Sequence, residues 1–454
     1  MSSNRLSPLD ASFLTVESET AHMHVGWAAL FAPPGRGSKP GFAELRDHVE
    51  DRLCRAPRYR QKLAQIPLGV GDPVWIDDED FDVHEHVLRA SSSDFGEVVD
   101  TAMSSPLDRD HPLWELWIAD GLEDGRIGVV GKAHHCMVDG LAAVELASLL
   151  VDPTPAPTRP APDSWRPAQT PDGPSLVATA LLARAGDALE VARLPLGLAR
   201  HPGRLVSLAR DFPRAVRALA HSVEPAPSGT PFNEPISPQR HLARARRPLA
   251  DLKQIKRHFG TTINDVVLTV AAGAVRRFLE RHGETPLGLK TMVPVSVRGS
   301  GGEGGLGNQI SFVFVELPCD EPDPVRRLHD INLAMSQRKL DGEPEGADAI
   351  MKAVGHAPRT LRQAVSRLVA SPRAFNLVVS NIPGPREPLY MCGCELEEVY
   401  PVVPIADRHA LAIGVTTIKD DSFFGIYADS ELLPDADVLA KGIDESIDEL
   451  VALS

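Results

Sequence analysis

A proline-rich stretch about a third of the way along the chain most constrains its fold. Residues 151–174, "VDPTPAPTRPAPDSWRPAQTPDGP", place prolines too close together for a helix or for the interior of a sheet, because proline lacks a backbone N–H and fixes φ. The stretch therefore predicts an extended linker. The chain must build its cores on either side of it, and 454 residues suffice for two or three domains.

Helix and strand patterns alternate on both sides of this linker. We therefore predict an α/β fold with an N-terminal half (1–152), a linker with crossover helices (153–232) and a C-terminal half (233–454). Before the linker, strands are expected at 22–32 and 125–135 and helices at 42–56 and from Leu141 onward; after it, a long helix is expected at 263–283, with strands at 289–298, 308–318, 375–383 and 410–418.

Charge and cysteine content narrow the classes of partner. The net charge of −15 argues against general nucleic-acid binding, which needs a basic surface. The five cysteines lack metal-finger spacing, so a reduced, cytoplasmic compartment is the simpler interpretation. Neither a signal peptide nor an apolar run long enough to span a bilayer is evident in the sequence.

The segment "KAHHCMVDG" (132–140) is the strongest candidate for a functional site. It lies where a predicted strand meets a predicted helix, and it joins His134 and His135 to Asp139 and Gly140. Neighbouring strand residues point to opposite faces, so the two histidines are poorly placed to bind one metal ion. His22 and His24 would share a strand face, but two ligands without a third are weak evidence for a metal site.

Two interpretations of the segment remain open on the residues alone. In the first, one histidine is an ordinary core residue and Asp139 caps the helix that begins near Leu141. In the second, His135 is a general base, because imidazole can take up and return a proton near neutral pH. The chain lacks a GxSxG elbow and a recognisable cysteine nucleophile, so such a base would act on a bound acceptor rather than on an enzyme nucleophile.

The pattern HHxxxDG is typical of acyl-CoA-dependent transferases related to chloramphenicol acetyltransferase and to peptide-synthetase condensation domains. The whole chain resembles, more narrowly, the bacterial wax ester synthase/acyl-CoA:diacylglycerol acyltransferase family. The matching stretches are "LSPLDASFL" (6–14), "MHVG" (23–26), "DPVWIDDEDFDVHEHV" (72–87), "SPLDRDHPLWE" (105–115), "TPFNEPIS" (230–237), "INDVVLTVAAGAVRRFL" (263–279), "MVPVSVR" (292–298), "GNQIS" (307–311) and "SNIPGP" (380–385).

The resemblance implies a role for each residue of the motif. His135 would deprotonate the acceptor hydroxyl as it attacks the acyl-CoA thioester, and His134 would point away and support the strand. Asp139 would fix the turn through an ion pair, for which Arg298 is the best candidate, and Gly140 would let the backbone turn tightly. Arg298 could instead be a solvated strand end.

Asn264 and Asp265 match a second motif of the family, Asn-Asp. They would contribute to substrate binding or to structure. The simpler alternative is that Asn264 caps the helix that follows, since asparagine is a favoured N-cap residue. The segment "PLW" (112–114) is expected to pack rather than to catalyse.

The resemblance further implies two chloramphenicol-acetyltransferase-like domains with a tunnel between them. The expected reaction transfers a long-chain acyl group from acyl-CoA to diacylglycerol, giving triacylglycerol, with wax ester formation from a long-chain alcohol as the close alternative. Acyl-CoA is then a substrate, and no cofactor is expected. Two alternative functions remain: a non-catalytic lipid-binding protein of the same fold, and an acyltransferase that uses a carrier-protein thioester.

The expected substrates also bear on where the protein works. Lipid acceptors partition into bilayers, so we expect a cytoplasmic protein that sits at the inner membrane face or on lipid inclusions without crossing the membrane. Residues 175–221 combine arginines with leucines, a composition that suits an anionic lipid surface. The alternative is that these residues pack between the two halves.

Overall fold

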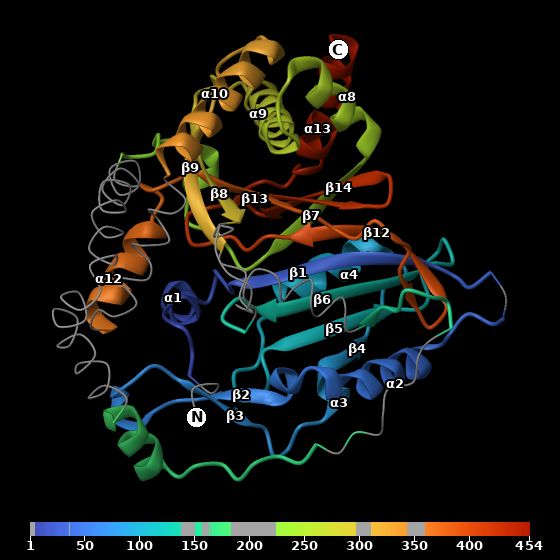
Figure 1. Cartoon of the computed structure of the whole chain (residues 1–454), viewed down its shortest axis with the longest axis vertical. Coiled ribbons are helices and arrows are strands. Elements are labelled where there is room, and N and C mark those ends of the chain that lie inside the picture. The colour runs from blue at the N-terminus through green and yellow to red at the C-terminus, as the bar shows by residue number, and fades with distance from the viewer. Residues whose placement is uncertain are drawn as a thin grey trace, which may run out of the picture.

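The computed structural model describes residues 5–35, 37–137, 150–156, 163, 165–182, 224–296, 310–342 and 359–454. Several features predicted from the sequence lie outside these residues: Asp139, Gly140, Arg298, most of the helix expected from Leu141, and residues 183–221 of the basic segment. The described chain is an α/β fold built on two six-stranded sheets and a small two-stranded one, as the sequence predicts (Figure 1).

The first sheet belongs mainly to the N-terminal half and has the strand order β11-β12-β1-β6-β5-β4. Every residue of β6 is buried, which confirms it as a central strand. Residues of β6 run antiparallel to β1, with His134 opposite His24. The strands are β1 (His24–Ala32), β4 (Val87–Arg89), β5 (Trp114–Ala119), β6 (Ile127–His134), β11 (Tyr390–Met391) and β12 (Cys394–Val402), and β2 (Gln61–Ala64) pairs with β3 (Val74–Asp77) in the small sheet.

The helices of this half have local sequence causes. Ser7 caps α1 (Pro8–Val16), and proline begins it. The helix predicted at 42–56 ends earlier than expected: α2 stops at Arg52, and Leu53–Arg55 form a single 3₁₀ turn, because the last turn of a helix often tightens in this way. The remaining helices are α2 (Phe42–Arg52), α3 (Val83–His86) and α4 (Phe95–Ser104).

The second sheet has the order β7-β14-β13-β10-β8-β9. Helices α8, α9, α10 and α13 cover one of its faces (Figure 1). The strands predicted after the linker are confirmed as β8, β9, β10 and β13. The elements are β7 (Arg240–Pro248), β8 (Leu289–Ser296), β9 (Ile310–Leu317), β10 (Leu377–Ile382), β13 (Leu411–Ile418), β14 (Asp421–Asp429), α8 (Leu249–Phe259), α9 (Ile263–Arg281), α10 (Pro324–Asp341), α12 (Arg359–Val369) and α13 (Asp437–Ala452).

Strand β12 connects the two halves. It pairs with β1 in the first sheet, where Val402 lies opposite Gly26, although it comes from the C-terminal half of the sequence. It also contacts β13 and β14 of the second sheet. There Pro401 lies against Gly414 and Gly425, and a Cβ added to Gly425 would come within 2.2 Å of the Pro401 carbonyl oxygen. Strand β12 therefore holds the two sheets together. Its Pro401 can pack so closely against the second sheet because residues 414 and 425 are glycines.

Candidate functional site

The end of β6 places the histidine pair. The His134 N–H donates to the carbonyl of Leu113 at 2.9 Å, and the His135 N–H donates to the carbonyl of Met23 at 3.0 Å. Met23 has a φ of 50°, a left-handed conformation that is uncommon for a residue with a side chain. The backbone on both sides thus fixes where β6 ends and where the turn with His135 begins.

The His134 side chain is buried and has defined neighbours on both ring nitrogens. Its Nδ1 accepts the Cys136 N–H at 3.0 Å, so the proton of the neutral ring resides on Nε2. That Nε2 lies 3.4 Å from the Glu17 carboxylate. Burial, followed by the charge of Arg109, lowers the pKa of His134 to about 3. His134 therefore remains neutral at physiological pH, with its ring orientation set by Cys136 and Glu17.

The His135 side chain lies against α1. Its ring stacks on the ring of Phe13, with 3.7 Å between the centroids and an interplanar angle of 11°. Unlike His134, it is only half-buried. The two histidines therefore differ in burial: His134 is enclosed by protein, whereas His135 is half-buried.

Two charged residues near the pair were not identified from the sequence. Arg109 forms an ion pair with Glu17, the residue that faces His134. Arg109 belongs to the stretch "SPLDRDHPLWE" and Phe13 to "LSPLDASFL", both of which match the family without revealing a role. No sequence motif marks Glu17 as a site residue. Its role comes from contacts with Arg109 and His134, which lie about 90 and 120 residues further along the chain.

A buried polar cluster lies behind the histidine pair. The His22 and His24 rings are 5.1 Å apart, and burial is the largest cause of the lowered pKa of each. Lys132, fully buried in β6, donates to the carbonyls of Ala102 and Ser105 at 2.8 Å each and so satisfies the C-terminal end of α4. Among the described residues, no group of three or more potential metal ligands occurs.

Asp265 of the Asn-Asp motif takes part in capping the start of α9. The N-cap is Thr262, whose hydroxyl accepts the Asp265 N–H, while the Asp265 carboxylate accepts the Thr262 N–H. The alternative that Asn264 caps this helix is therefore wrong: Asn264 lies within the first turn, and the capping box is the Thr262–Asp265 pair. Asp265 also accepts a hydrogen bond from Asn332 of α10 at 2.8 Å.

Trp114 of the "PLW" segment packs as expected. It is fully buried, its indole N–H donates to the Tyr59 carbonyl at 2.7 Å, and it stacks on His86 with 4.7 Å between the centroids. The ion pair between Asp139 and Arg298, and the turn at Gly140, lie outside the described residues and stay predictions.

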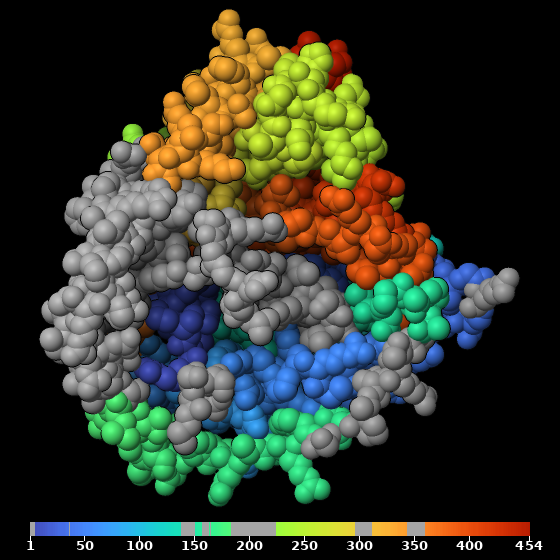
Figure 2. Space-filling view, in the orientation of Figure 1, coloured from blue at the N-terminus to red at the C-terminus, as the bar shows by residue number. Residues whose placement is uncertain are grey.

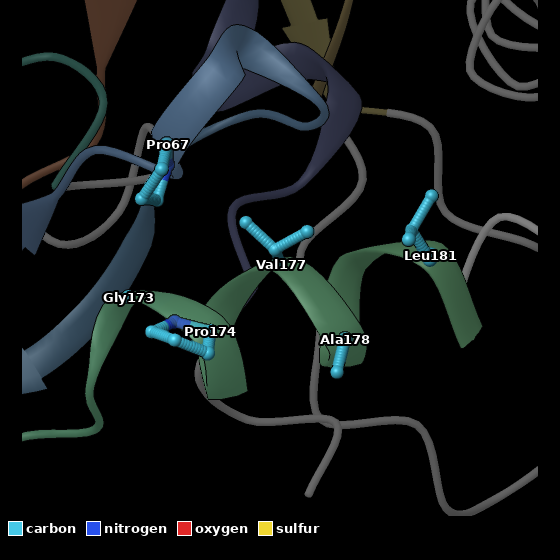
Figure 3. A pocket seen from close by; sticks show the side chains of 6 residues that line it. All are labelled: Pro67, Gly173, Pro174, Val177, Ala178 and Leu181. Atoms are coloured by element: carbon cyan, nitrogen blue, oxygen red, sulfur yellow. The ribbon is translucent and has the colours of Figure 1, made fainter.

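An apolar pocket lies away from the histidine pair. Figure 3 shows Pro67 facing the helical residues 173–182, with Val177 and Leu181 on the same side of that helix. The lining residues are Pro67, Gly173, Pro174, Val177, Ala178 and Leu181. None of the described residues that line the pocket is charged, so they offer hydrophobic contact rather than acid–base chemistry.

Comparison with known proteins identifies the family. A family model described as the wax ester synthase/diacylglycerol acyltransferase catalytic domain matches residues 6–267, and a model of the C-terminal domain of the same family matches residues 306–451. The chain belongs to the wax ester synthase/diacylglycerol acyltransferase family. It is accordingly an acyltransferase, as the HHxxxDG pattern implied.

Relatives match this family member over nearly its whole length. A probable diacylglycerol O-acyltransferase of Mycobacterium tuberculosis is 32% identical over 461 residues, covering 99% of this chain and 96% of the relative. A second one from the same organism is 33% identical over 465 residues, covering 98% of each chain. The ordered set of short stretches in the sequence thus reflects a relationship that extends through both halves.

Solved structures support the fold. The wax ester synthase/diacylglycerol acyltransferase of Marinobacter aquaeolei superposes with a TM-score of 0.71 at 26% identity, covering 98% of each chain. A condensation domain of the CDA synthetase shares the fold with a TM-score of 0.59 at 14% identity, covering 99% of this chain and 96% of that one. The predicted two-domain architecture related to chloramphenicol acetyltransferase is confirmed.

Proposed function

We propose that this acyltransferase transfers a long-chain acyl group from acyl-CoA to diacylglycerol, with His135 as the general base. The acceptor O–H loses its proton to the imidazole while its oxygen bonds to the thioester carbon. The tetrahedral intermediate then expels the coenzyme A thiolate, which recovers the proton from the imidazolium. The observation that carries the proposal is the half-buried His135 directly after β6 in a chain of this family.

The environment of the neighbouring cysteine supports direct transfer without an acyl-enzyme. Cys136 follows His135 in the sequence, but it is buried, and burial raises the pKa of its thiol far above the usual range. A thiol held in its protonated form is a poor nucleophile. The acceptor hydroxyl is therefore the group that attacks the thioester.

The choice of acceptor rests on the relatives. The mycobacterial relatives carry the name diacylglycerol O-acyltransferase, which favours diacylglycerol and the product triacylglycerol. The Marinobacter protein, named for both activities, favours a long-chain alcohol as the second candidate acceptor. A tunnel between the two halves that brings both substrates to His135 is part of this proposal.

One experiment tests the reaction and the acceptor together. Purified protein is incubated with palmitoyl-CoA and either diacylglycerol or hexadecanol, coenzyme A release is followed, and the lipids are separated. We expect triacylglycerol to form faster than wax ester. Faster wax ester formation would favour the second candidate. Absence of any coenzyme A release would favour the non-catalytic lipid-binding alternative, and turnover only with acyl-carrier-protein donors would favour the carrier-dependent one.

We also propose that the protein meets its lipid substrates at a membrane or lipid-inclusion surface. Three described segments expose leucines. Leu68, in the 3₁₀ turn Pro67–Gly69, is 91% exposed, Leu182 is 74% exposed and Leu368 of α12 is 61% exposed, and Leu181 and Leu361 are about half exposed. We call Leu68, Leu181, Leu182, Leu361 and Leu368 the exposed leucine group. Within the described residues, no helix is long and apolar enough to cross a membrane.

Contacts join these segments into one side of the molecule. Arg359 of α12 donates to the carbonyls of Gly69 and Gly71 at 3.3 and 3.2 Å, which joins α12 to the 3₁₀ turn of Leu68. The same turn contributes Pro67 to the apolar pocket on residues 173–182. The segment that contains residues 173–182 is visible at the lower left in Figure 2. Apolar side chains presented together in this way bind a bilayer surface by leaving water.

Vesicle co-sedimentation tests this location. The double variant Leu361→Gln, Leu368→Gln should bind vesicles of phosphatidylcholine and phosphatidylglycerol at least about fivefold less than the wild type, because two leucines lose their transfer energy. The matched control is Leu340→Gln, an 86% exposed leucine at the end of α10, which should bind normally. Equal binding by all three proteins would reject the exposed leucine group as the lipid-contacting surface.

A further inference from the structure

The stretch "LSPLDASFL" has no role in the chemistry proposed so far. It forms α1, whose start is well defined: the Ser7 hydroxyl accepts the Asp10 N–H at 3.1 Å, and the Asp10 carboxylate accepts the Ser7 N–H at 3.3 Å. Leu6 and Ala11 are buried, and α1 packs against α12. These contacts hold α1 in a fixed position beside the ends of β1 and β6 (Figure 1).

This one helix reaches both histidines of the HHxxxDG motif. Phe13 stacks on His135 with 3.7 Å between the centroids, and the C-cap residue Glu17 lies 3.4 Å from the Nε2 of His134. The Glu17 N–H donates to the Phe13 carbonyl at 3.1 Å, so the two contacts come from a single helical turn. Arg109 pairs with Glu17 and anchors the turn from the other side.

We propose that α1 is a positioning element for the histidine pair, and that Phe13 is the positioning residue that sets the ring plane of His135. The proposal rests on the proposed function, in which His135 moves the proton. Phe13 itself does not touch the reacting atoms. Its ring acts through the imidazole, and its substitution should alter turnover rather than substrate binding.

The physical reason lies in the freedom of a histidine ring. The χ2 torsion of histidine is broad, so the torsional preference of the side chain does not by itself fix where the ring nitrogens point. A nearly parallel aromatic face at 3.7 Å restricts rotation of the ring. A leucine fills a similar volume but offers no flat face, whereas a tyrosine keeps the face. General base catalysis depends on this alignment.

Three variants separate positioning from a general loss of structure. Phe13→Leu should lower kcat about three- to tenfold, the range expected when an aromatic contact is lost, with the KM for acyl-CoA within about twofold of the wild type. Phe13→Tyr should restore kcat to within about twofold. Leu14→Ala is the matched control, because Leu14 lies on the same helix and packs against the core; it should lower the melting temperature without the same loss of kcat.

A spectroscopic measurement reads the geometry independently of activity. In protein labelled on histidine, the His135 ring protons are identified by their absence in His135→Ala. Protons above an aromatic face resonate upfield, so they should lie upfield in the wild type and in Phe13→Tyr and move downfield in Phe13→Leu. The wild-type spectrum alone tests the stacking should Phe13→Leu fail to fold.

The outcomes distinguish this proposal from the one on which it rests. Wild-type kcat in Phe13→Leu, equal losses in Phe13→Leu and Phe13→Tyr, or unshifted His135 protons in the wild type would each overturn the role of Phe13. Full turnover in His135→Ala would instead overturn the proposed function, whatever the spectra show. Loss of turnover in His135→Ala with unchanged Phe13→Leu would leave the proposed function intact and remove only the positioning role.

Discussion

At the scale of single residues, the two adjacent histidines have different surroundings. His134 has a neighbour at each ring nitrogen and a pKa of about 3, which suits a neutral structural residue. His135 is half-buried and stacked on Phe13, which suits a group that meets a substrate. One position along the chain therefore separates a supporting histidine from the candidate base.

This difference predicts unequal effects of substitution. His135→Ala should lower the rate of coenzyme A release by about 10²–10⁴-fold, the usual contribution of a general base, while the melting temperature changes little. His134→Ala should lose less rate and more stability, because the Cys136 N–H and Glu17 lose their neighbour in a buried site. Steady-state kinetics and thermal unfolding of both variants check this, and equal, small rate losses would contradict the assignment.

The sequence predicted the location of the site better than its surroundings. The strand that ends at the histidine pair follows from a local apolar run, and the different burial of the two histidines agrees with the alternation of strand side chains. Phe13, Glu17 and Arg109 could not be assigned, because the contacts between α1, residue 109 and β6 form only in three dimensions. For the same reason Asn264 was a plausible cap until the structure placed Thr262 at that position.

At the scale of elements, close packing between β1 and β6 requires glycine. A Cβ added to Gly131 of β6 would lie 2.6 Å from ring atoms of Trp27 on β1. Neither strand can yield easily, because β6 is central and β1 lies between β12 and β6. The small residue three positions before His134 thus sets how closely the two strands that carry the site approach.

Gly131→Ala should therefore destabilise the protein by about 1–3 kcal/mol, the usual cost of overpacking a core, and should lower activity through the displaced end of β6. The matched control is Gly121→Ala, since nothing lies within 4 Å of a Cβ added there. Urea unfolding of the two variants measures the difference. An unchanged midpoint for Gly131→Ala would show that Trp27 can move aside.

Elements with a strong local pattern were predicted well. Apolar runs located β1, β6 and the strands after the linker, and the spacing of apolar residues along an amphipathic helix located α9. No comparable sequence pattern indicates that β12 pairs with β1. Strand pairing between residues 26 and 402 depends on which edges meet after both halves have collapsed, and no spacing within either strand encodes that choice.

At the scale of the whole molecule, buried neutral histidines couple folding to pH. Burial lowers the pKa of His134 to about 3, that of His409 to about 4, and that of His24 well below its usual value. Each is less protonated in the folded than in the unfolded state below about pH 6.5. Their contribution to stability is therefore fully present above that pH and is lost as the pH falls from 6.5 toward the folded values. His241, whose pKa is raised chiefly by its hydrogen bond to Asp100, opposes this trend.

The free energy of unfolding should consequently fall between pH 6.5 and 5, by on the order of 1 kcal/mol per pH unit for each such histidine. His409→Gln removes one that the proposed chemistry does not use, and the stability of this variant should depend less steeply on pH. Urea unfolding at pH 7.5, 6.5, 5.5 and 5.0 gives both slopes. Parallel slopes for the wild type and the variant would exclude a contribution from His409.

The crossing of β12 from one sheet to the other has a consequence for biosynthesis. Strand β1 leaves the ribosome early and can pair with β6 on one side, but its other partner lies about 370 residues further along the chain. At ordinary translation rates, that edge of β1 stays unpaired for roughly 20–70 s before β12 has been synthesised. An unpaired strand edge can pair with strands of other chains. Nascent or truncated protein that ends before residue 394 is therefore expected to aggregate unless a chaperone binds the edge of β1.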